Sequence, residues 1–185
     1  MKELSLNILD ISMNSVKAKA DLIRIELTED DSTLTIKISD NGCGMEPEFL
    51  NTVTDAWSTT RTTRKVGMGI PFFKLAAEQT GGTLSIESTP ERLGKHHGTI
   101  ICAVFNKSSI DFTPLGDIIS TITTLIQGSP AIHWIFCHRI GNNEITLDTD
   151  ELKAVLGDVG LDNHEVLMWI SCYLREAYEE INYKC

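Results

Sequence analysis

Polar side chains recur at helical spacing near the start of the chain. Asp10, Asn14 and Lys17 follow one another at steps of four and three residues, so on a helix they project from one face. A carboxylate beside an amide can orient a water molecule and bind a hard cation such as Mg²⁺, and the ammonium one turn further on can meet a phosphate. The solvated face of an amphipathic helix has the same spacing, so the pattern alone leaves both interpretations open.

A second group of residues follows a β-branched run and has the sequence Asp40-Asn41-Gly42-Cys43-Gly44-Met45. A carboxylate at a strand end can accept a hydrogen bond from an exocyclic amine, and glycines let the backbone approach a flat ring closely. Asp-Asn-Gly is also a strong turn signal. The motif is therefore compatible with a ligand site and with a simple turn.

A third group opens a helix with Gly67-Met68-Gly69. Backbone N–H groups at a helix start are unpaired and aligned with the positive end of the helix dipole, which favours an anion. Between Trp57 and Leu75 the chain has no acid and four bases, which are Arg61, Arg64, Lys65 and Lys74. This local inversion of charge suits a polyphosphate. A basic loop that contacts a protein is the alternative.

The common nucleotide-binding motifs are absent. Gly42-x-Gly44 and Gly67-x-Gly69 lack the third glycine of a dinucleotide-binding turn, and Gly94-Lys95 lacks the remaining residues of a P-loop. Rossmann and Walker-type nucleotide sites are therefore unsupported.

The elements that position these groups follow from apolar periodicity. We expect helices at 4–17, 47–53 and 70–80, and strands at 22–27, 34–39, 83–87 and 98–105. The acidic turn at 29–32 predicts a hairpin between the first two strands. These elements indicate one two-layer α/β unit over residues 1–106.

Residues 107–185 form an extension with a different charge balance. Five bases against twelve acids give the extension a net charge of −7, whereas eleven against fourteen give −3 for residues 1–106. We expect helices at 114–127, 149–156 and 163–183, and strands at 132–137 and 144–147. The pattern is compatible with docking on the first unit, with dimerisation and with binding of a partner.

Composition narrows the class of protein. The 185 residues carry a formal net charge of −10, which repels nucleic acid and anionic membrane surfaces. No signal peptide and no run of 18 apolar residues is present, so we expect neither export nor a membrane span. The five cysteines are odd in number and lack C-x-x-C spacing, which favours reduced thiols in the cytoplasm.

Taken in order, these groups resemble the ATP-binding domain of the GHKL superfamily, which includes gyrase, a heat-shock chaperone, sensor histidine kinases and mismatch-repair ATPases. The resemblance covers residues 3–106. Residues 9–18 are similar to the N-box of that superfamily, 40–45 to its first glycine box, 65–70 to its second, and 98–100 to its final Gly-Thr strand. It implies an α+β fold: a two-layer α/β sandwich of the Bergerat type, with helices on one face of a mixed sheet and a C-terminal α/β extension.

The resemblance also implies roles for single residues. Asn14 would bind Mg²⁺, Asp40 would recognise the adenine amine, and Thr99 would support Asp40 through water. Gly67 and Gly69 would cradle the phosphates under a lid at 46–66. The full set of implied nucleotide-binding residues is Asn14, Lys17, Asp40, Gly42, Gly44, Met45, Arg61, Arg64, Lys65, Gly67, Met68, Gly69, Ile70 and Thr99.

Two departures from the superfamily affect the expected chemistry. Hydrolytic members carry Glu four residues before the N-box Asn, where this chain has Asp10, which is one methylene shorter. We therefore expect Asp10 to be the catalytic base only of slow hydrolysis or of transfer. Sensor kinases also have a helical hairpin with a phosphoacceptor His upstream of the N-box, whereas only a few residues precede the N-box here. We therefore do not expect a self-contained sensor kinase.

The leading hypothesis is an ATP-binding regulatory protein that binds Mg-ATP under the lid. It would transfer the γ-phosphoryl group to a partner protein, as the similar anti-sigma serine kinases do, or hydrolyse ATP slowly. The alternative is a nucleotide-gated interaction module without phosphoryl chemistry, whose partner binds residues 107–185. An ATP-driven clamp that forms a homodimer is the third option.

Overall fold

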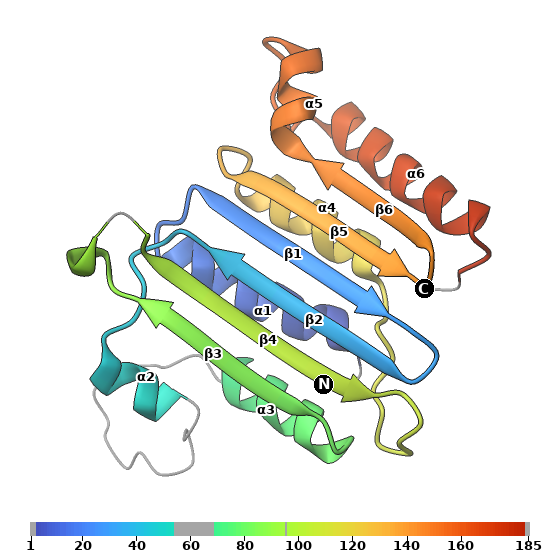
Figure 1. Cartoon of the computed structure of the whole chain (residues 1–185). Helices are drawn as coiled ribbons and strands as arrows, with labels where there is room; N and C mark the ends of the chain where they lie inside the picture. The colour runs from blue at the N-terminus through green and yellow to red at the C-terminus, as the bar shows by residue number, and fades with distance from the viewer. Residues whose placement is uncertain (1–2, 54–68, 95, 184–185) are drawn as a thin grey trace.

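A computed structural model of the chain describes residues 3–53, 69–94 and 96–183. Within these ranges six strands form one mixed sheet in the order β3-β4-β2-β1-β5-β6 (Figure 1). The strands are β1 (Leu22–Glu29), β2 (Thr33–Asp40), β3 (Thr83–Thr89), β4 (Gly98–Asn106), β5 (His133–Ile140) and β6 (Asn143–Asp148).

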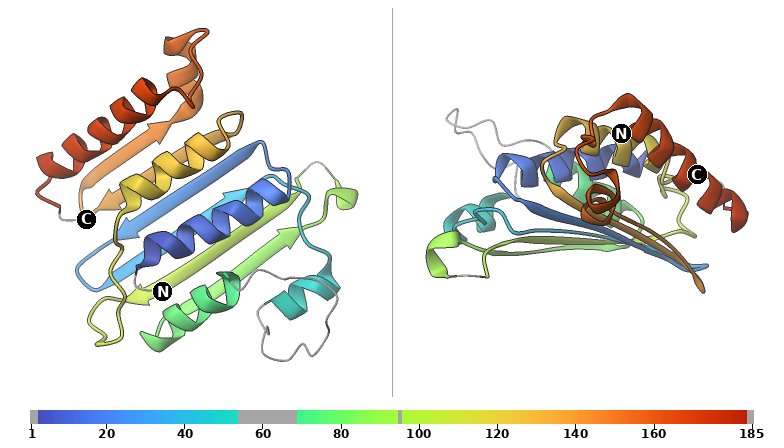
Figure 2. Two further views of the ribbon diagram at one scale, coloured as in Figure 1. Left: turned by 180° about the vertical axis from the view of Figure 1, so that it is seen from behind. Right: turned by 90° about the horizontal axis from the view of Figure 1, so that it is seen from above.

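Helices pack on one face of this sheet, and no helix of the described residues covers the other face (Figure 2). They are α1 (Leu4–Lys17), α2 (Pro47–Val53), α3 (Gly69–Gln79), α4 (Ile118–Gly128), α5 (Thr149–Leu156) and α6 (His164–Glu180), with a short 3₁₀ helix η1 (Glu91–Leu93). The expected two-layer sandwich with helices on one face of a mixed sheet is confirmed.

Capping residues set the ends of the helices in the extension. The helix expected at 114–127 begins only at Ile118, because Asp117 caps it and accepts a hydrogen bond of 2.8 Å from the Ser120 N–H. Asn163 caps α6 in the same way through the Glu165 N–H. Apolar periodicity located these helices, whereas the hydrogen-bonding side chains decide where each begins.

The β1–β2 hairpin brings the end of β2 to the start of β1. Its turn is held by Asp30, whose carboxylate accepts hydrogen bonds of 2.7 Å from the Ser32 and Thr33 N–H groups. The antiparallel register pairs Ile23 with Asp40. Asp40 therefore lies at the end of the central strand β2, close to the end of α1.

Residues 107–185 continue the same sheet. β5 pairs with β1 in parallel, with Leu22 opposite His133, and β6 pairs with β5 antiparallel. The parallel pairing requires the chain to cross over the sheet, and α4 makes that crossing next to α1. Docking on the sheet is thus the arrangement that the described residues adopt.

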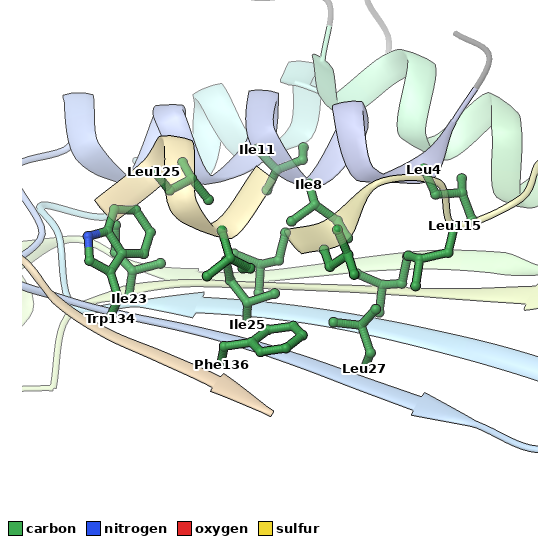
Figure 3. Packing of buried hydrophobic residues seen from close by; sticks show 14 of the residues in the cluster. Leu4, Ile8, Ile11, Ile23, Ile25, Leu27, Leu115, Leu125, Trp134 and Phe136 are labelled. Atoms are coloured by element: carbon green, nitrogen blue, oxygen red, sulfur yellow. The ribbon is translucent and has the colours of Figure 1, made fainter. Parts of the chain in front are cut away.

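The core lies between the helices and the sheet. Leu4, Ile8 and Ile11 of α1 face alternate residues of β1 and of β5, all of them buried (Figure 3). Burying each such side chain contributes about 1.5–3 kcal/mol. The packing holds α1 in place along its length, and α1 in turn carries its polar residues to the end of β2. The β1 and β5 partners in this layer are Ile23, Ile25, Leu27, Trp134 and Phe136.

Small polar residues on α1 allow its neighbours to come close. Ser5 and Ser12 are buried, and the Thr121 hydroxyl on α4 donates a hydrogen bond of 3.3 Å to the Ser5 carbonyl. Helices that meet through small side chains approach closely, so α1 packs between α3 and α4. No helix in the described ranges is long and apolar enough to cross a membrane.

Candidate functional site

A cavity of about 520 Å³ opens where α1, the end of β2, α2 and the start of α3 meet. It contains most of the described residues that the sequence analysis selected, together with apolar side chains. Its lining consists of Ile11, Asn14, Ser15, Lys17, Ala18, Asp40, Gly44, Met45, Phe49, Val53, Ile70, Thr99 and Ile101.

Asp40 is the fixed carboxylate of this cavity. The Ser15 hydroxyl on α1 donates a hydrogen bond of 2.6 Å to Asp40 Oδ2. The Gly42 N–H donates one of 2.9 Å to Asp40 Oδ1. A charged acceptor held by two donors keeps one orientation, and each oxygen retains a further lone pair for a ligand.

Thr99 lies directly opposite Asp40 in the β2–β4 register. Its hydroxyl is 2.9 Å from Ser88 Oγ on β3. The same Ser88 oxygen accepts a hydrogen bond of 2.8 Å from the Met45 N–H and lies 3.1 Å from the Gly98 carbonyl oxygen. Ser88 therefore joins β4 to the glycine loop that follows β2.

The loop at 41–45 packs tightly on its surroundings. Gly44 has φ +66°, and a Cβ there would lie 2.0 Å from the Thr89 carbonyl oxygen. At Gly42 a Cβ would lie 2.8 Å from the Ala18 Cβ atom. Only glycine fits at either position, because any side chain would displace backbone.

Hydrogen bonds hold this loop to its neighbours. The Cys43 N–H donates a bond of 2.9 Å to the Ala18 carbonyl at the end of α1, and the Glu91 N–H donates one of 2.9 Å to the Cys43 carbonyl. His97 Nδ1 is 2.6 Å from the Gly42 carbonyl oxygen, which requires a proton on that nitrogen. The loop is thus fixed before any ligand arrives.

The polar face of α1 reaches the cavity with two of its three candidate residues. Asn14 is half-buried and Lys17 is exposed, and both line the cavity. Asp10 is exposed and is absent from the lining. It lies instead beside the start of α3, where a Cβ on Gly69 would come within 3.1 Å of the Asp10 Cβ atom.

Apolar side chains complete the walls. Ile70 and Ile101 are buried at 6% and 4% exposure, while Met45 is half-buried and packs against the core. Aliphatic walls beside a fixed carboxylate suit a flat, partly polar ring.

Part of the expected lid belongs to the described residues. Helix α2 and the preceding Glu46 are described, and the Arg92 guanidinium donates two hydrogen bonds to Glu46, of 2.8 and 2.6 Å. These bonds hold the pKa of the Glu46 carboxyl below its usual value. The remaining candidates Arg61, Arg64, Lys65, Gly67 and Met68 lie outside the described residues.

Three contacts of this site were missed by sequence reasoning. Ser15 occupies a core-facing position one turn after Ile11, so a hydroxyl in an apolar stripe was the available signal. Ser88 continues the inward alternation of Leu84 and Ile86 on β3. His97 carried no local signal, because its contact with the glycine loop joins residues far apart in the chain.

Comparison with known proteins identifies the family of this chain. The family model described as histidine kinase-, DNA gyrase B- and HSP90-like ATPase matches residues 1–109. A protein of Bacillus subtilis (strain 168) described as "Probable C4-dicarboxylate sensor kinase" is 31% identical over 77 residues. That alignment covers 42% of this chain and only 14% of the sensor kinase.

Two solved structures illustrate the similarity in fold. The crystal structure of the N-terminal domain of a DNA repair protein has a TM-score of 0.56 at 15% identity, over 80% of this chain and 53% of that one. The Aquifex aeolicus MutL ATPase domain complexed with ADP has a TM-score of 0.52 at 14% identity, over 84% of this chain and 69% of that one. At such identities the likeness concerns the fold.

Proposed function

Because the chain belongs to the family of histidine kinase-, DNA gyrase B- and HSP90-like ATPases, we propose that it is an ATP-dependent regulator of a protein partner. ATP binds in the cavity beside Asp40, and the nucleotide state is communicated to the partner. The free thiols of Cys43 and Cys172 are exposed, which supports action in the reducing cytoplasm.

The geometry of Asp40 is the observation that carries this proposal. Its carboxylate is oriented by Ser15 and Gly42, and aliphatic side chains stand beside it. An exocyclic amine of adenine can donate to such a carboxylate while the ring occupies the apolar space. Thr99, opposite Asp40 on β4, would support that recognition through water.

The phosphate end of the cavity fits a magnesium nucleotide. Lys17 supplies a cation and Asn14 an amide oxygen, which is a ligand type that Mg²⁺ accepts. No group of three or more His, Cys, Asp or Glu residues among those described could hold a metal by itself. Asn14 would therefore share Mg²⁺ with the phosphates, and the ion would neutralise phosphoryl charge.

Phosphoryl transfer to the partner is the reaction we assign to this site. A hydroxyl of the partner attacks the γ-phosphorus, the bond from that phosphorus to the bridging oxygen breaks, and ADP leaves. Asp10 takes the hydroxyl proton as general base. With water in place of the hydroxyl, the same steps give slow hydrolysis.

A regulator that binds ATP without phosphoryl chemistry is the second candidate. The position of Asp10 favours it, because this carboxylate is exposed and stands outside the cavity lining. Under that function ATP would act only by changing which conformation is populated.

The test of nucleotide binding is a calorimetric titration of the full chain with Mg-ATP and Mg-ADP. We expect saturable binding that Asp40→Asn abolishes, because an amide presents an N–H group to the adenine amine. Asp111→Asn, on an exposed residue remote from the cavity, is the matched control and should bind normally. Absence of binding to the folded native chain would refute the proposal.

A further inference from the structure

A second cavity lies beside β6, the edge strand of the sheet, and shares no lining residue with the cavity beside Asp40. It is formed by α5, the loop that follows and α6, at the β6 edge (Figure 1). Its volume is about 540 Å³, and we name it the α5–α6 groove. Its apolar lining residues are Leu152, Val155, Leu156, Val159, Val166 and Trp169.

Large apolar side chains of this groove are exposed to solvent. Val155 is 87% exposed, Trp169 53% and Val159 45%. Single exposed apolar residues are ordinary on a protein surface, but a contiguous set around a hollow marks an interaction site. Burial of these apolar side chains by a binding partner is therefore favourable.

Trp169 is held as a rigid anchor. Its ring stacks on Tyr173 at 5.4 Å between centroids and 7° between planes. The Tyr173 hydroxyl donates a hydrogen bond of 3.1 Å to the Thr146 carbonyl on β6. Because the pair is fixed in advance, little side-chain entropy is lost when a partner covers it. Tryptophan and tyrosine are the residues most often found at the centre of tight protein interfaces.

The rim of the groove is negative. Residues 148–165 contain six acids, one lysine and no arginine. The lysine, Lys153, is already paired with Asp150 at 3.0 Å. Glu165 lines the groove, Glu151 belongs to α5, and Asp158 and Asp162 belong to the loop between α5 and α6. None of these four acids forms an ion pair with any residue in the described part of the chain.

We propose that the α5–α6 groove binds an amphipathic helix of a partner protein, with apolar residues in the groove and lysines or arginines against the acidic rim. A helix presents such residues at i, i+3, i+4 and i+7 to a hydrophobic groove. Unpaired acids on the rim favour basic flanks on the partner, which also speed association. The inference deepens the proposed function, because it assigns the surface and the chemistry of the regulated partner.

Charge argues against the other occupants of this groove. A second copy of this chain would bring a net charge of −10, and an anionic membrane surface would be repelled in the same way. The acidic rim favours an occupant with positive charge, and a basic segment of a partner protein has that charge.

The test uses a fluorescein-labelled synthetic peptide of about 14 residues, which is roughly four helical turns. Its leucines form one stripe at i, i+3, i+4 and i+7, and lysines occupy the remaining face. Anisotropy titrations with the full chain, without nucleotide, should show saturable binding at least roughly tenfold tighter than binding of a scrambled peptide of identical composition. A peptide with glutamate in place of lysine should not bind.

Variants of the groove locate the binding. Val155→Lys, at a largely exposed position where the fold is not at risk, and Trp169→Ala should each weaken binding by roughly tenfold or more. Glu165→Lys should weaken it through the rim charge. Ile110→Ala is the matched control, because Ile110 is 99% exposed and lies outside the groove, and it should bind as the native chain does.

Three results would overturn the proposal. Equal binding of the striped and scrambled peptides would show attraction by charge alone. Unchanged binding by both Val155→Lys and Trp169→Ala would remove the groove as the site. A dimer in sedimentation equilibrium that Trp169→Ala dissociates would assign the groove to a second copy. The peptide titration is repeated with Asp40→Asn. Its result shows whether peptide binding depends on the nucleotide site, so that failure of this proposal can be told apart from failure of nucleotide binding.

Discussion

Ser15 and Asp40 are 25 residues apart, and a hydrogen bond of 2.6 Å from the Ser15 hydroxyl to Asp40 Oδ2 joins them. The bond connects the core-facing side of α1 to the last residue of β2. Because Ser15 is buried, its hydroxyl has little freedom to choose another acceptor. The orientation of the Asp40 carboxylate is therefore decided by the packing of α1 on the sheet, before a ligand binds.

Ser15→Ala should weaken Mg-ATP binding by roughly tenfold, because a hydrogen bond to a charged group contributes about 1.5–3 kcal/mol and tenfold corresponds to about 1.4 kcal/mol. Calorimetry measures the change. Ser12→Ala is the matched control, since Ser12 is also buried on α1 but its Oγ has no hydrogen-bond partner among the described residues. Equal losses in the two variants would mean that Ser15 acts only through helix packing.

Gly44→Ala should abolish nucleotide binding and lower thermal stability. The residue has φ +66°, and the added Cβ would overlap the Thr89 carbonyl oxygen at 2.0 Å. Gly81→Ala separates strain from overlap, because Gly81 has φ +77° but no atom of the described residues lies within 4 Å of the added Cβ. We expect Gly81→Ala to cost about 1 kcal/mol and to leave binding intact. Normal ATP affinity in Gly44→Ala would contradict the tight packing of the loop.

Most secondary elements could be predicted because their signals are local. The spacing of Leu4, Ile8 and Ile11 predicts a helix whose apolar stripe faces the core, and α1 spans the expected 4–17. The alternation in 22–27 and 34–39 likewise predicts the first two strands, which extend by one or two residues at their ends. Local periodicity is sufficient to predict a helix or strand when the buried residues lie on one face of that element.

Pairing between distant segments could not be predicted in the same way. Nothing near His133 indicates that β5 joins β1 in parallel, because parallel pairing depends on the path of the connecting chain. For the same reason Ser15 could not be predicted as a hydrogen-bond partner of Asp40. Gly42 is a close neighbour in sequence, whereas Ser15 reaches Asp40 only through the tertiary packing of α1.

Asp10→Asn should leave Mg-ATP affinity within about twofold and reduce phosphoryl transfer or hydrolysis by roughly 100-fold or more, since general-base catalysis contributes about that much. The γ-phosphate released or transferred from labelled ATP is the readout. Asp10→Glu should raise hydrolysis, because the added methylene brings the carboxylate closer to the cavity. Equal rates in all three proteins would favour the regulator without phosphoryl chemistry.

Stability in acid should depend on Glu29, at the far end of β1. Burial alone would raise the pKa of Glu29, but the neighbouring His138, at 3.5 Å, together with Lys107 and Tyr183 outweighs it and lowers the pKa from 4.5 to about 2. The Lys107 ammonium and the Tyr183 hydroxyl both lie 2.6 Å from its oxygens. These contacts join the C-terminal residues of the chain to the sheet.

Since the folded pKa of Glu29 is depressed, its stabilising contribution is complete above about pH 4.5 and is lost as the pH falls toward 2. Glu29→Gln should therefore lower the free energy of unfolding at pH 7 by about 1–3 kcal/mol, because it leaves the half-buried Lys107 and Tyr183 donors without a charged acceptor. The difference from the native chain, measured by urea unfolding, should shrink steadily between pH 4.5 and pH 2. Glu78→Gln, which breaks only an exposed pair with Lys74 at 3.9 Å, should cost less than about 0.5 kcal/mol at every pH. A Glu29→Gln deficit that stays constant down to pH 2 would show that the residue stabilises the fold through packing and not through its charge.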